Sequence, residues 1–242
     1  MSAPTRRQFL SAAGALGVVT LAPNVFLMTR TAEAAMRAPG EAANPAQRWG
    51  LLIDLNKNPD GWDFMVKACR DENGWAGIDR PKTDAQWVRE VTVRDPKSGA
   101  VSKVPVMCQH CEQPPCVDVC PTGASMRRDD GIVLVDKHTC IGCRYCMMAC
   151  PYAARSFVHE DVQGQKPHAP RGKGTVESCT LCVHRIDQGR LPACVEADGG
   201  RAILFGDLND PASAITKEVG KTITTRIRAD LGVEPAVHYR GF

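Results

Sequence analysis

The chain has 242 residues, 12 of them cysteine, and its 30 basic and 27 acidic residues nearly cancel. A chain this close to neutrality has no basic excess for binding nucleic acid, so that function class is excluded. No apolar run after residue 35 approaches the roughly 20 residues of a transmembrane helix, and the body of the chain is therefore not expected to span a membrane.

The first 34 residues have the pattern of an export signal. Two arginines stand in the segment TRRQFL (residues 5–10), a weakly apolar stretch follows, and AEA (residues 32–34) is a small-residue cleavage site. This pattern is typical of twin-arginine signal peptides, so residues 1–34 are predicted to direct export to the periplasm. The alternative is an uncleaved anchor, although two glycines and a proline make residues 9–28 a poor membrane helix.

Short apolar runs bounded by Gly, Pro and Asp predict strands in the rest of the chain, at about 49–55, 87–93, 131–135 and 201–205. Residues 164–174, with two prolines and several basic residues, are expected to form an exposed loop. The tail after about residue 208 is expected to be helical and then extended. The pattern predicts an α+β fold in which cysteine loops separate the strands, with Trp49, Trp62, Trp75 and Trp87 in the core or an interface.

Eleven of the cysteines lie between Cys108 and Cys194 and have the spacing of iron-sulfur ligands. The central segment CIGCRYCMMACP (residues 140–151) is a C-x2-C-x2-C-x3-C-P string, in which three thiolates hold one 4Fe-4S cluster and the fourth turns to another. A looser copy runs from Cys108 to Pro121, and a third contains Cys179, Cys182 and Cys194. With Cys69, the thiolates suffice for three 4Fe-4S clusters.

Disulfides and a zinc site are the two alternatives for these cysteines. An even number of cysteines in an exported protein favours disulfides in general. Twin-arginine substrates, however, fold and acquire cofactors in the reducing cytoplasm, so that iron can take the thiols before an oxidant does. Tetrahedral zinc sites use paired C-x2-C knuckles rather than a fourth cysteine followed by proline. Both alternatives are therefore minor.

An internal repeat indicates which ligands have been lost. Asp198 follows Cys194 as Cys120 follows Cys116, so a fourth thiolate is missing there. The partners expected before Cys69 are missing too, at the positions of Met65, Trp62 and Pro59. In a crossed pair of motifs these four positions would belong to a single cluster, so one cluster site is predicted to be lost and Asp198 is not expected to be a ligand.

The ligand swap between paired motifs then assigns the twelve cysteines to three clusters. The predicted ligand sets are Cys108, Cys111, Cys116 and Cys150; Cys120, Cys140, Cys143 and Cys146; and Cys69, Cys179, Cys182 and Cys194.

The motifs resemble those of a known family. Several segments are similar to the four-motif, DMSO-reductase-type iron-sulfur electron-transfer subunits of bacterial respiratory complexes. They are RWG (48–50), IDL (53–55), Cys69-x-x-Glu72-Asn73, PPC (114–116), CPTGA (120–124), and CTLC (179–182) followed by Arg185-Ile186 and PAC (192–194). The likeness covers about residues 46–210. Since such subunits usually carry four clusters, this chain departs from them by the loss of one.

The resemblance implies two ferredoxin-like 4Fe-4S pairs fused by crossed motifs. Residues 46–104 and 174–210 would form an outer half with one cluster, residues 105–160 an inner domain with two, and residues 211–242 a C-terminal extension. It also implies a periplasmic electron-transfer subunit of a membrane-bound respiratory or sulfur-metabolism (Dsr-type) complex. Its expected partners are an integral membrane quinone-reactive subunit, through which it would associate with the membrane, and a periplasmic cytochrome c. The alternative is the corresponding subunit of a periplasmic tetrathionate, polysulfide or nitrite reductase.

The sequence does not predict an enzyme in its own right. An enzyme needs an open coordination site or convergent acid-base groups, and no such pattern is present. His110 and His184 lie inside cysteine loops, where a histidine can donate a hydrogen bond to cluster sulfur. A solvated position is the more ordinary expectation for a loop histidine.

Overall fold

The computed structural model describes residues 17–22, 25–29, 41–77, 79–80 and 83–242. The chain divides into two units, residues 1–34 and 35–242. The described part of the first unit is an antiparallel pair, β1 (Gly17–Ala22) and β2 (Val25–Thr29), in which Gly17 is opposite Thr29. The twin arginines and the AEA segment lie outside the described residues. Among the described helices, none has both the length and the apolar character to cross a membrane.

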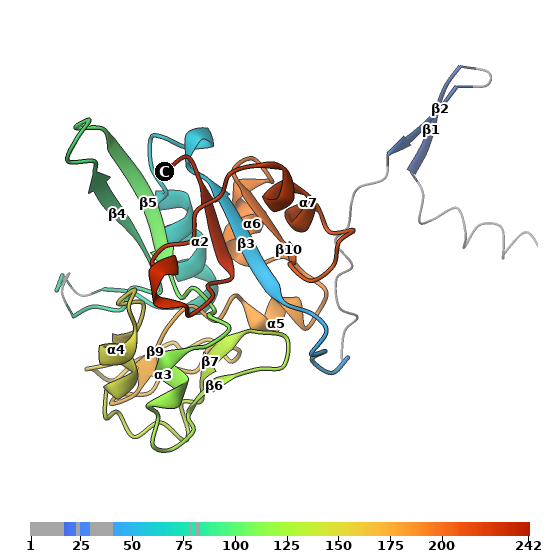
Figure 1. Cartoon of the computed structure of the whole chain (residues 1–242). Helices are drawn as coiled ribbons and strands as arrows, with labels where there is room; N and C mark the ends of the chain where they lie inside the picture. Colours follow the sequence, from blue (N-terminus) through green and yellow to red (C-terminus); the bar gives the residue numbers. More distant parts are fainter. Residues whose placement is uncertain (1–16, 23–24, 30–40, 78, 81–82) are drawn as a thin grey trace, which may run out of the picture. The chain divides into compact units, whose positions relative to one another are not determined.

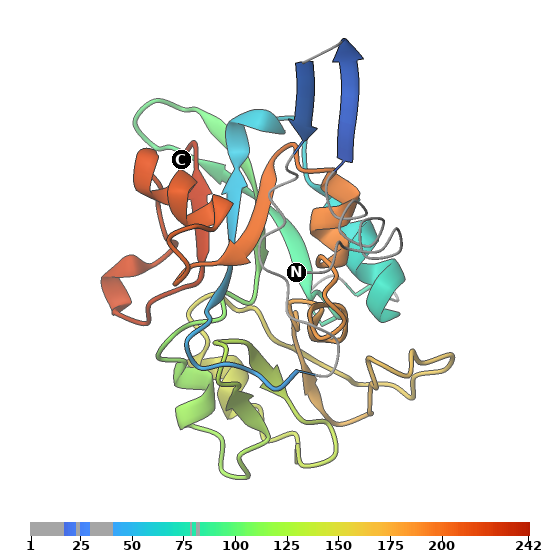
Figure 2. The same ribbon diagram turned by 90° about the vertical axis from the view of Figure 1, so that its right-hand side faces the viewer.

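A three-stranded sheet carries the core of the second unit (Figures 1 and 2). Its central strand β3 (Trp49–Asp54) pairs antiparallel with β10 (Ile203–Asp207) and parallel with β11 (Val237–Arg240). Every residue of β3 is buried, as expected for a continuous apolar run covered on both faces. The strands predicted near 49–55 and 201–205 are confirmed, as is the helical and then extended tail, in which α7 (Ala214–Lys221) precedes η2 (Ala229–Leu231) and β11.

A hairpin and three helical segments complete this part of the unit. The hairpin consists of β4 (Val88–Arg94) and β5 (Val101–Met107), and η1 (Leu55–Lys57) follows β3. Helix α2 (Asp63–Asn73) ends at Gly74, which is left-handed with φ 70°, and packs against α6 (Ala193–Asp198). The four tryptophans are all buried in the core, as predicted.

The remaining elements are short and gather at the lower end of the unit in Figures 1 and 2. Helix α3 (Pro115–Asp118) leads to the pair β6 (Ser125–Arg127) and β7 (Val133–Val135), and α4 (Tyr145–Ala149) leads to β8 (Ser156–Phe157), which pairs with β9 (Val176–Glu177). Helix α5 (Val183–Ile186) precedes α6, which leads to β10. The predicted repeat of cysteine loop, short helix and strand is therefore present, and the fold is α+β.

The loop over residues 164–174 is mostly exposed, as predicted. Ala169 and Arg171 are the exceptions, because both are buried. The Arg171 guanidinium forms a buried ion pair with Glu177 of β9, with Nε 2.8 Å from Oε2, and His168 Nε2 lies 2.9 Å from the carbonyl oxygen of Glu72 in α2. Arg171 and His168 therefore fasten this loop to β9 and α2.

Candidate functional site

The twelve cysteines are all free thiols, and they converge on three cavities. Each cavity is lined by four cysteines, three from one motif and one from another, in the same combinations that the ligand swap assigns. We name them by burial: the deep set (Cys69, Cys179, Cys182, Cys194), the middle set (Cys108, Cys111, Cys116, Cys150) and the outer set (Cys120, Cys140, Cys143, Cys146).

All four cysteines of the deep set are buried, with exposed fractions of 8% or less. Cys69 lies in α2 and Cys194 in α6, so the packing of these helices brings the isolated N-terminal cysteine to the last motif. Trp75 Nε1 donates to Cys69 Sγ at 3.3 Å, and the Leu181 amide donates to Cys179 Sγ at 3.4 Å. Burial raises the pKa of the Cys69, Cys179 and Cys194 thiols well above the ordinary value. A cation must therefore displace these protons when the thiols become ligands.

A charged cluster fastens α2 to the loop that carries Cys182. Arg185 Nη2 donates to Glu72 Oε2 at 3.0 Å and its Nη1 to Glu196 Oε2 at 2.6 Å, while His184 Nε2 lies 2.8 Å from Glu72 Oε1. The hydrogen bond from Arg185 is the main reason that the pKa of Glu72 is lowered to about 2. Glu72, His168 and His184 come close enough together to suggest a metal site, but Arg185 already engages the carboxylate and the two histidine rings stack at 3.9 Å.

The middle set lies where β5 ends and α3 begins. The Ala154 amide donates to Cys150 Sγ at 3.5 Å, and Arg155 Nη2 donates to Cys116 Sγ at 3.0 Å. Burial raises the pKa of Cys108 to about 12 and that of Cys111 to about 11. The C-terminal segment closes over this loop, because the Ala236 amide donates to the Gln109 carbonyl at 2.8 Å and Tyr239 Oη donates to the Pro105 carbonyl at 2.9 Å.

His110 corrects an expectation from the sequence. A solvated position was expected, but the side chain is 1% exposed and its Nδ1 accepts a hydrogen bond from the Val133 amide at 3.0 Å. Burial lowers the pKa of His110 to about 3, so the ring is neutral and carries its proton on Nε2. The loop geometry that buries it, with φ 44° at His110, is invisible in the spacing of the motif.

The outer set reaches the surface. Cys143 is exposed, whereas Cys146 is buried in α4. The Ser125 amide donates to Cys120 Sγ at 3.3 Å and the Val176 amide to Cys140 Sγ at 3.5 Å. Gly142, with φ 70°, lies so close to the Gly174 carbonyl that a Cβ atom there would be 2.1 Å from the oxygen, so only glycine fits this loop.

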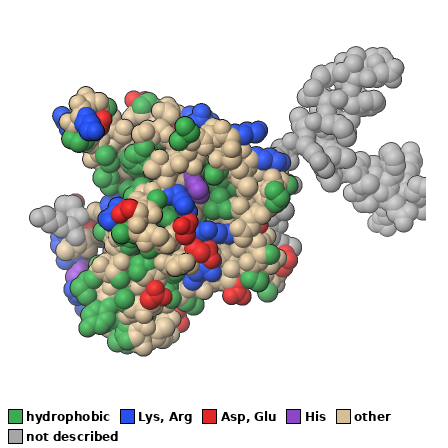
Figure 3. Space-filling view, viewed as in Figure 1, with side chains coloured by type: hydrophobic (Ala, Val, Ile, Leu, Met, Phe, Trp, Pro, Cys, Tyr) green, Lys and Arg blue, Asp and Glu red, His purple; other side chains and the backbone are tan. Residues whose placement is uncertain are grey.

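Exposed apolar side chains surround the outer set. Ile141 is 68% exposed and Met148 72% exposed, and Tyr145, Met126 and Val119 are also exposed. In Figure 3 hydrophobic side chains gather on the lower part of the visible face, where Figure 1 has α3 and α4. We call these five residues the apolar rim.

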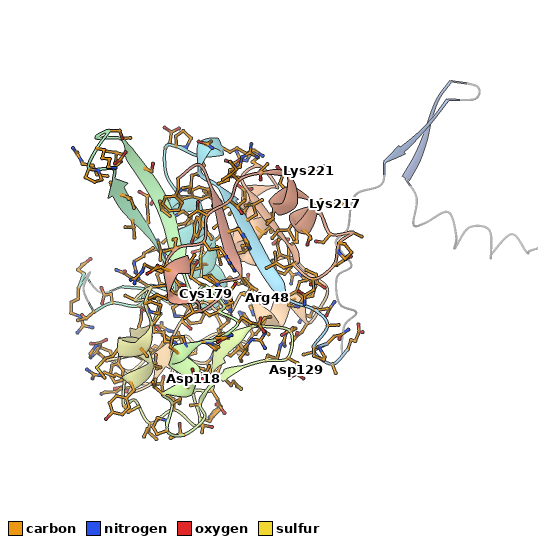
Figure 4. All side chains as sticks on the ribbon, viewed as in Figure 1. Arg48, Asp118, Asp129, Cys179, Lys217 and Lys221 are labelled. Carbon is orange, nitrogen blue, oxygen red and sulfur yellow. The ribbon has the colours of Figure 1, made fainter. Side chains whose placement is uncertain are left out.

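The three sets form a series from the interior to the surface. Cys179 of the deep set is labelled in Figure 4. All four cysteines of the deep set are buried, against three of the middle set and one of the outer set. Cys108 of the middle set is among the groups that raise the pKa of Cys179, and Cys116 and Cys146 both raise the pKa of Arg155. The order is therefore deep, middle and outer.

Three of the four positions without thiols have other roles. Asp198 is 2% exposed, and its Oδ2 accepts hydrogen bonds from the Ala202 and Ile203 amides at 2.7 and 3.0 Å. Trp62 Nε1 donates to the Lys103 carbonyl at 3.0 Å, and Met65 is fully buried against the deep set. Asp198 lines none of the three cavities.

The three sets suit a 4Fe-4S cluster by their chemistry. Four thiols converge in each, and N–H donors already point at sulfur atoms in all three, as they do around thiolate-bound clusters. The sequence did not predict Trp75, Glu72, Arg185 or Arg155 as residues that support the cysteine sets. Their roles depend on which elements pack together. Only Glu72 and Arg185 stand at positions of the family motifs.

The comparisons with known proteins agree with this chemistry. Residues 99–208 match the model of the 4Fe-4S dicluster domain family. The chain is 37% identical to the Hdr-like menaquinol oxidoreductase iron-sulfur subunit 1 of Archaeoglobus fulgidus, over 97% of each protein. It is 35% identical to a tetrathionate reductase subunit of Salmonella typhimurium, over 98% of this chain and 88% of that protein. It is 33% identical to protein NrfC of Escherichia coli K12, over 97% and 94%. The chain therefore belongs to the ferredoxin-type 4Fe-4S dicluster subunits that transfer electrons in oxidoreductase complexes, and its cysteines bind 4Fe-4S clusters.

Proposed function

We propose that the chain carries three 4Fe-4S clusters, one in each cysteine set, and relays electrons through them in the order deep, middle and outer or the reverse. The convergence of twelve free thiols into three groups of four, arranged in series, carries this proposal. The clusters supply one-electron chemistry, while the protein supplies ligands, N–H donors to sulfur and exclusion of water.

The fourth cluster site of four-motif relatives is absent in this proposal. Trp62 and Met65 fill their positions as core residues, and Asp198 caps the start of β10 with its carboxylate. A cluster there would need four thiolates, and none of these residues has a thiol.

The proposed place of action is the periplasm, reached through the twin-arginine signal of residues 1–34. Within the family, we propose that the chain acts as the periplasmic ferredoxin of a Dsr sulfur-metabolism membrane complex, in the role of DsrO. The extended similarity to a subunit named for menaquinol oxidation supports a quinone-reactive partner. The similarity to the tetrathionate reductase subunit supports the second candidate, the electron-transfer subunit of a periplasmic tetrathionate, polysulfide or nitrite reductase.

The integral membrane quinone-reactive subunit is proposed to dock at the outer set and to exchange electrons with it. Electron transfer needs close approach of the redox centres, and Cys143 is the exposed cysteine of the chain. The apolar rim around it offers the kind of surface that a permanent subunit interface buries. A periplasmic cytochrome c is the proposed second redox partner.

Iron and acid-labile sulfide quantitation on anaerobically purified protein tests the number of clusters. The expected result is equal molar amounts of iron and sulfide, sufficient for three four-iron clusters per chain. A low-temperature EPR titration should then show signals from three reduced clusters. Iron sufficient for only two clusters, or zinc in their place, would refute the proposal.

A further inference from the structure

Arg155 has an unusual environment for a charged side chain. It precedes β8 and is 5% exposed, and its Nη2 donates to Cys116 Sγ of the middle set at 3.0 Å. Its Nε and Nη1 atoms are buried without a hydrogen-bond acceptor of suitable geometry. Among the described residues, no carboxylate forms an ion pair with this guanidinium. The side chain is a buried cation whose neighbours are cysteines.

Such a cation needs a negative counterpart. Removing a guanidinium from water costs several kcal/mol unless opposite charge and hydrogen-bond acceptors replace the solvent. Burial alone would lower the pKa of Arg155, but Cys116, Cys108 and Cys146 raise it above the ordinary value. Arg155 lines the middle cavity, and it lines a second cavity together with Met147, the neighbour of Cys146 of the outer set. Negative charge on either side of Arg155 therefore supplies the missing counterpart.

The same attraction acts on the clusters. One-electron reduction makes a cluster more negative, and a fixed positive charge in a medium of low dielectric favours the reduced form. Net charge and hydrogen bonds to sulfur are among the properties that set iron-sulfur potentials. A cation between two clusters therefore raises the potentials of both.

We propose that Arg155 is a shared potential-setting residue, which raises the reduction potentials of the middle and outer clusters together. This inference rests on the three-cluster function proposed above. Arg155 lies outside the cysteine motifs, and it acts through the cluster ligands rather than by binding iron.

Arg155→Gln is the decisive variant, measured by EPR redox titration. Removing the charge is expected to shift the middle and outer clusters to lower potential, each by at least tenfold in the equilibrium constant for reduction, or about 59 mV for a one-electron couple. The deep cluster is expected to shift less, because Arg155 lines the middle cavity and not the deep one. Arg155→Lys keeps the charge, so its potentials are expected to lie closer to the wild-type values than those of Arg155→Gln.

Arg144→Gln is the matched control. Arg144 adjoins Cys143 and lines the outer cavity, but it is exposed, and its guanidinium lies 3.8 Å from the ring centroid of Phe157. Solvent screens such a charge. The variant removes the same formal charge at a similar place, and its shift is expected to be smaller and confined to the outer cluster.

A measurement on the unaltered protein covers the case in which Arg155→Gln fails to assemble its clusters. Protein labelled with ¹⁵N in the guanidino groups of arginine is expected to show a ¹⁵N hyperfine coupling to a reduced cluster in pulsed EPR. If wild-type protein contains three clusters but shows no such coupling, or if Arg155→Gln leaves all three potentials unchanged, the role of Arg155 is wrong. If wild-type protein lacks three clusters, the proposed function itself fails.

Discussion

Cys69 is separated in sequence from the other eleven cysteines, yet its sulfur lies in the deep cavity with Cys179, Cys182 and Cys194. Cys69→Ala is therefore expected to damage the deep cluster, converting it to a three-iron form or losing it, while the middle and outer clusters persist. EPR of the oxidised variant would detect a three-iron signal. Retention of three intact four-iron clusters would show that Cys69 is not a ligand.

Asp198 gives the complementary prediction. Its carboxylate accepts two buried amide hydrogen bonds, and bonds to charged groups contribute about 1.5–3 kcal/mol each. Asp198→Ala is expected to lower the thermal unfolding midpoint while leaving three clusters with nearly unchanged potentials.

Two further variants separate the structural role of Asp198 from a ligand role. Asp198→Asn keeps one acceptor oxygen, so it should be less destabilising than Asp198→Ala. Asp198→Cys should not create a fourth cluster, because Pro59, Trp62 and Met65 provide no thiolates. Loss of one cluster in Asp198→Ala would contradict both expectations.

At the scale of elements, α2 must stay docked on the loop before α6 if Cys69 is to reach its partners. Glu72 joins them through Arg185, with a side chain that is 20% exposed. Glu72→Gln removes the charge from this contact and is expected to cost about 1.5–3 kcal/mol of stability. The deep cluster should then lose iron to a chelator faster, with the middle and outer clusters unaffected.

Glu196→Gln is the control for that prediction. Glu196 binds the same guanidinium, but its side chain is 58% exposed, and exposed ion pairs contribute about 0–1 kcal/mol. Equal iron loss in the two variants would mean that the Glu72 contact has no special part in docking α2.

At the scale of the whole molecule, the apolar rim is expected to hold the membrane partner. Met148→Glu places a charge beside the outer set and should weaken copurification with the quinone-reactive subunit and slow quinol-dependent cluster reduction in membranes. Ile223→Glu changes a side chain that is 94% exposed and not part of the rim, so it serves as the control. Equal loss of binding in both variants would remove the rim from the proposed interface.

Export is the second prediction at this scale. Changing both Arg6 and Arg7 to Lys is expected to leave cofactor-loaded precursor in the cytoplasm, because a receptor reads the arginine pair rather than hydrophobicity alone. Cell fractionation with immunoblotting measures the distribution. Normal accumulation of the double variant in the periplasm would exclude the twin-arginine route.

Features that depend on local spacing could be predicted from the amino-acid sequence. The cysteine strings indicated cluster chemistry, and the apolar runs predicted β3, β4, β7 and β10 to within a few residues, because ligand loops and strand patterns are short-range features. The repeat also predicted that position 198, where it would place a cysteine, is not a ligand, because the residue there is Asp.

Features that depend on contacts between distant segments could be seen only in the folded chain. The parallel pairing of β11 with β3, the burial of His110, and the docking of Arg171 on Glu177 have no local signature, because packing of the whole unit determines them. The same holds for Arg155, a basic residue that the fold buries with a hydrogen bond to Cys116 of the middle set. A charge acts on its neighbours through space rather than along the chain, so only the folded arrangement reveals which groups it affects.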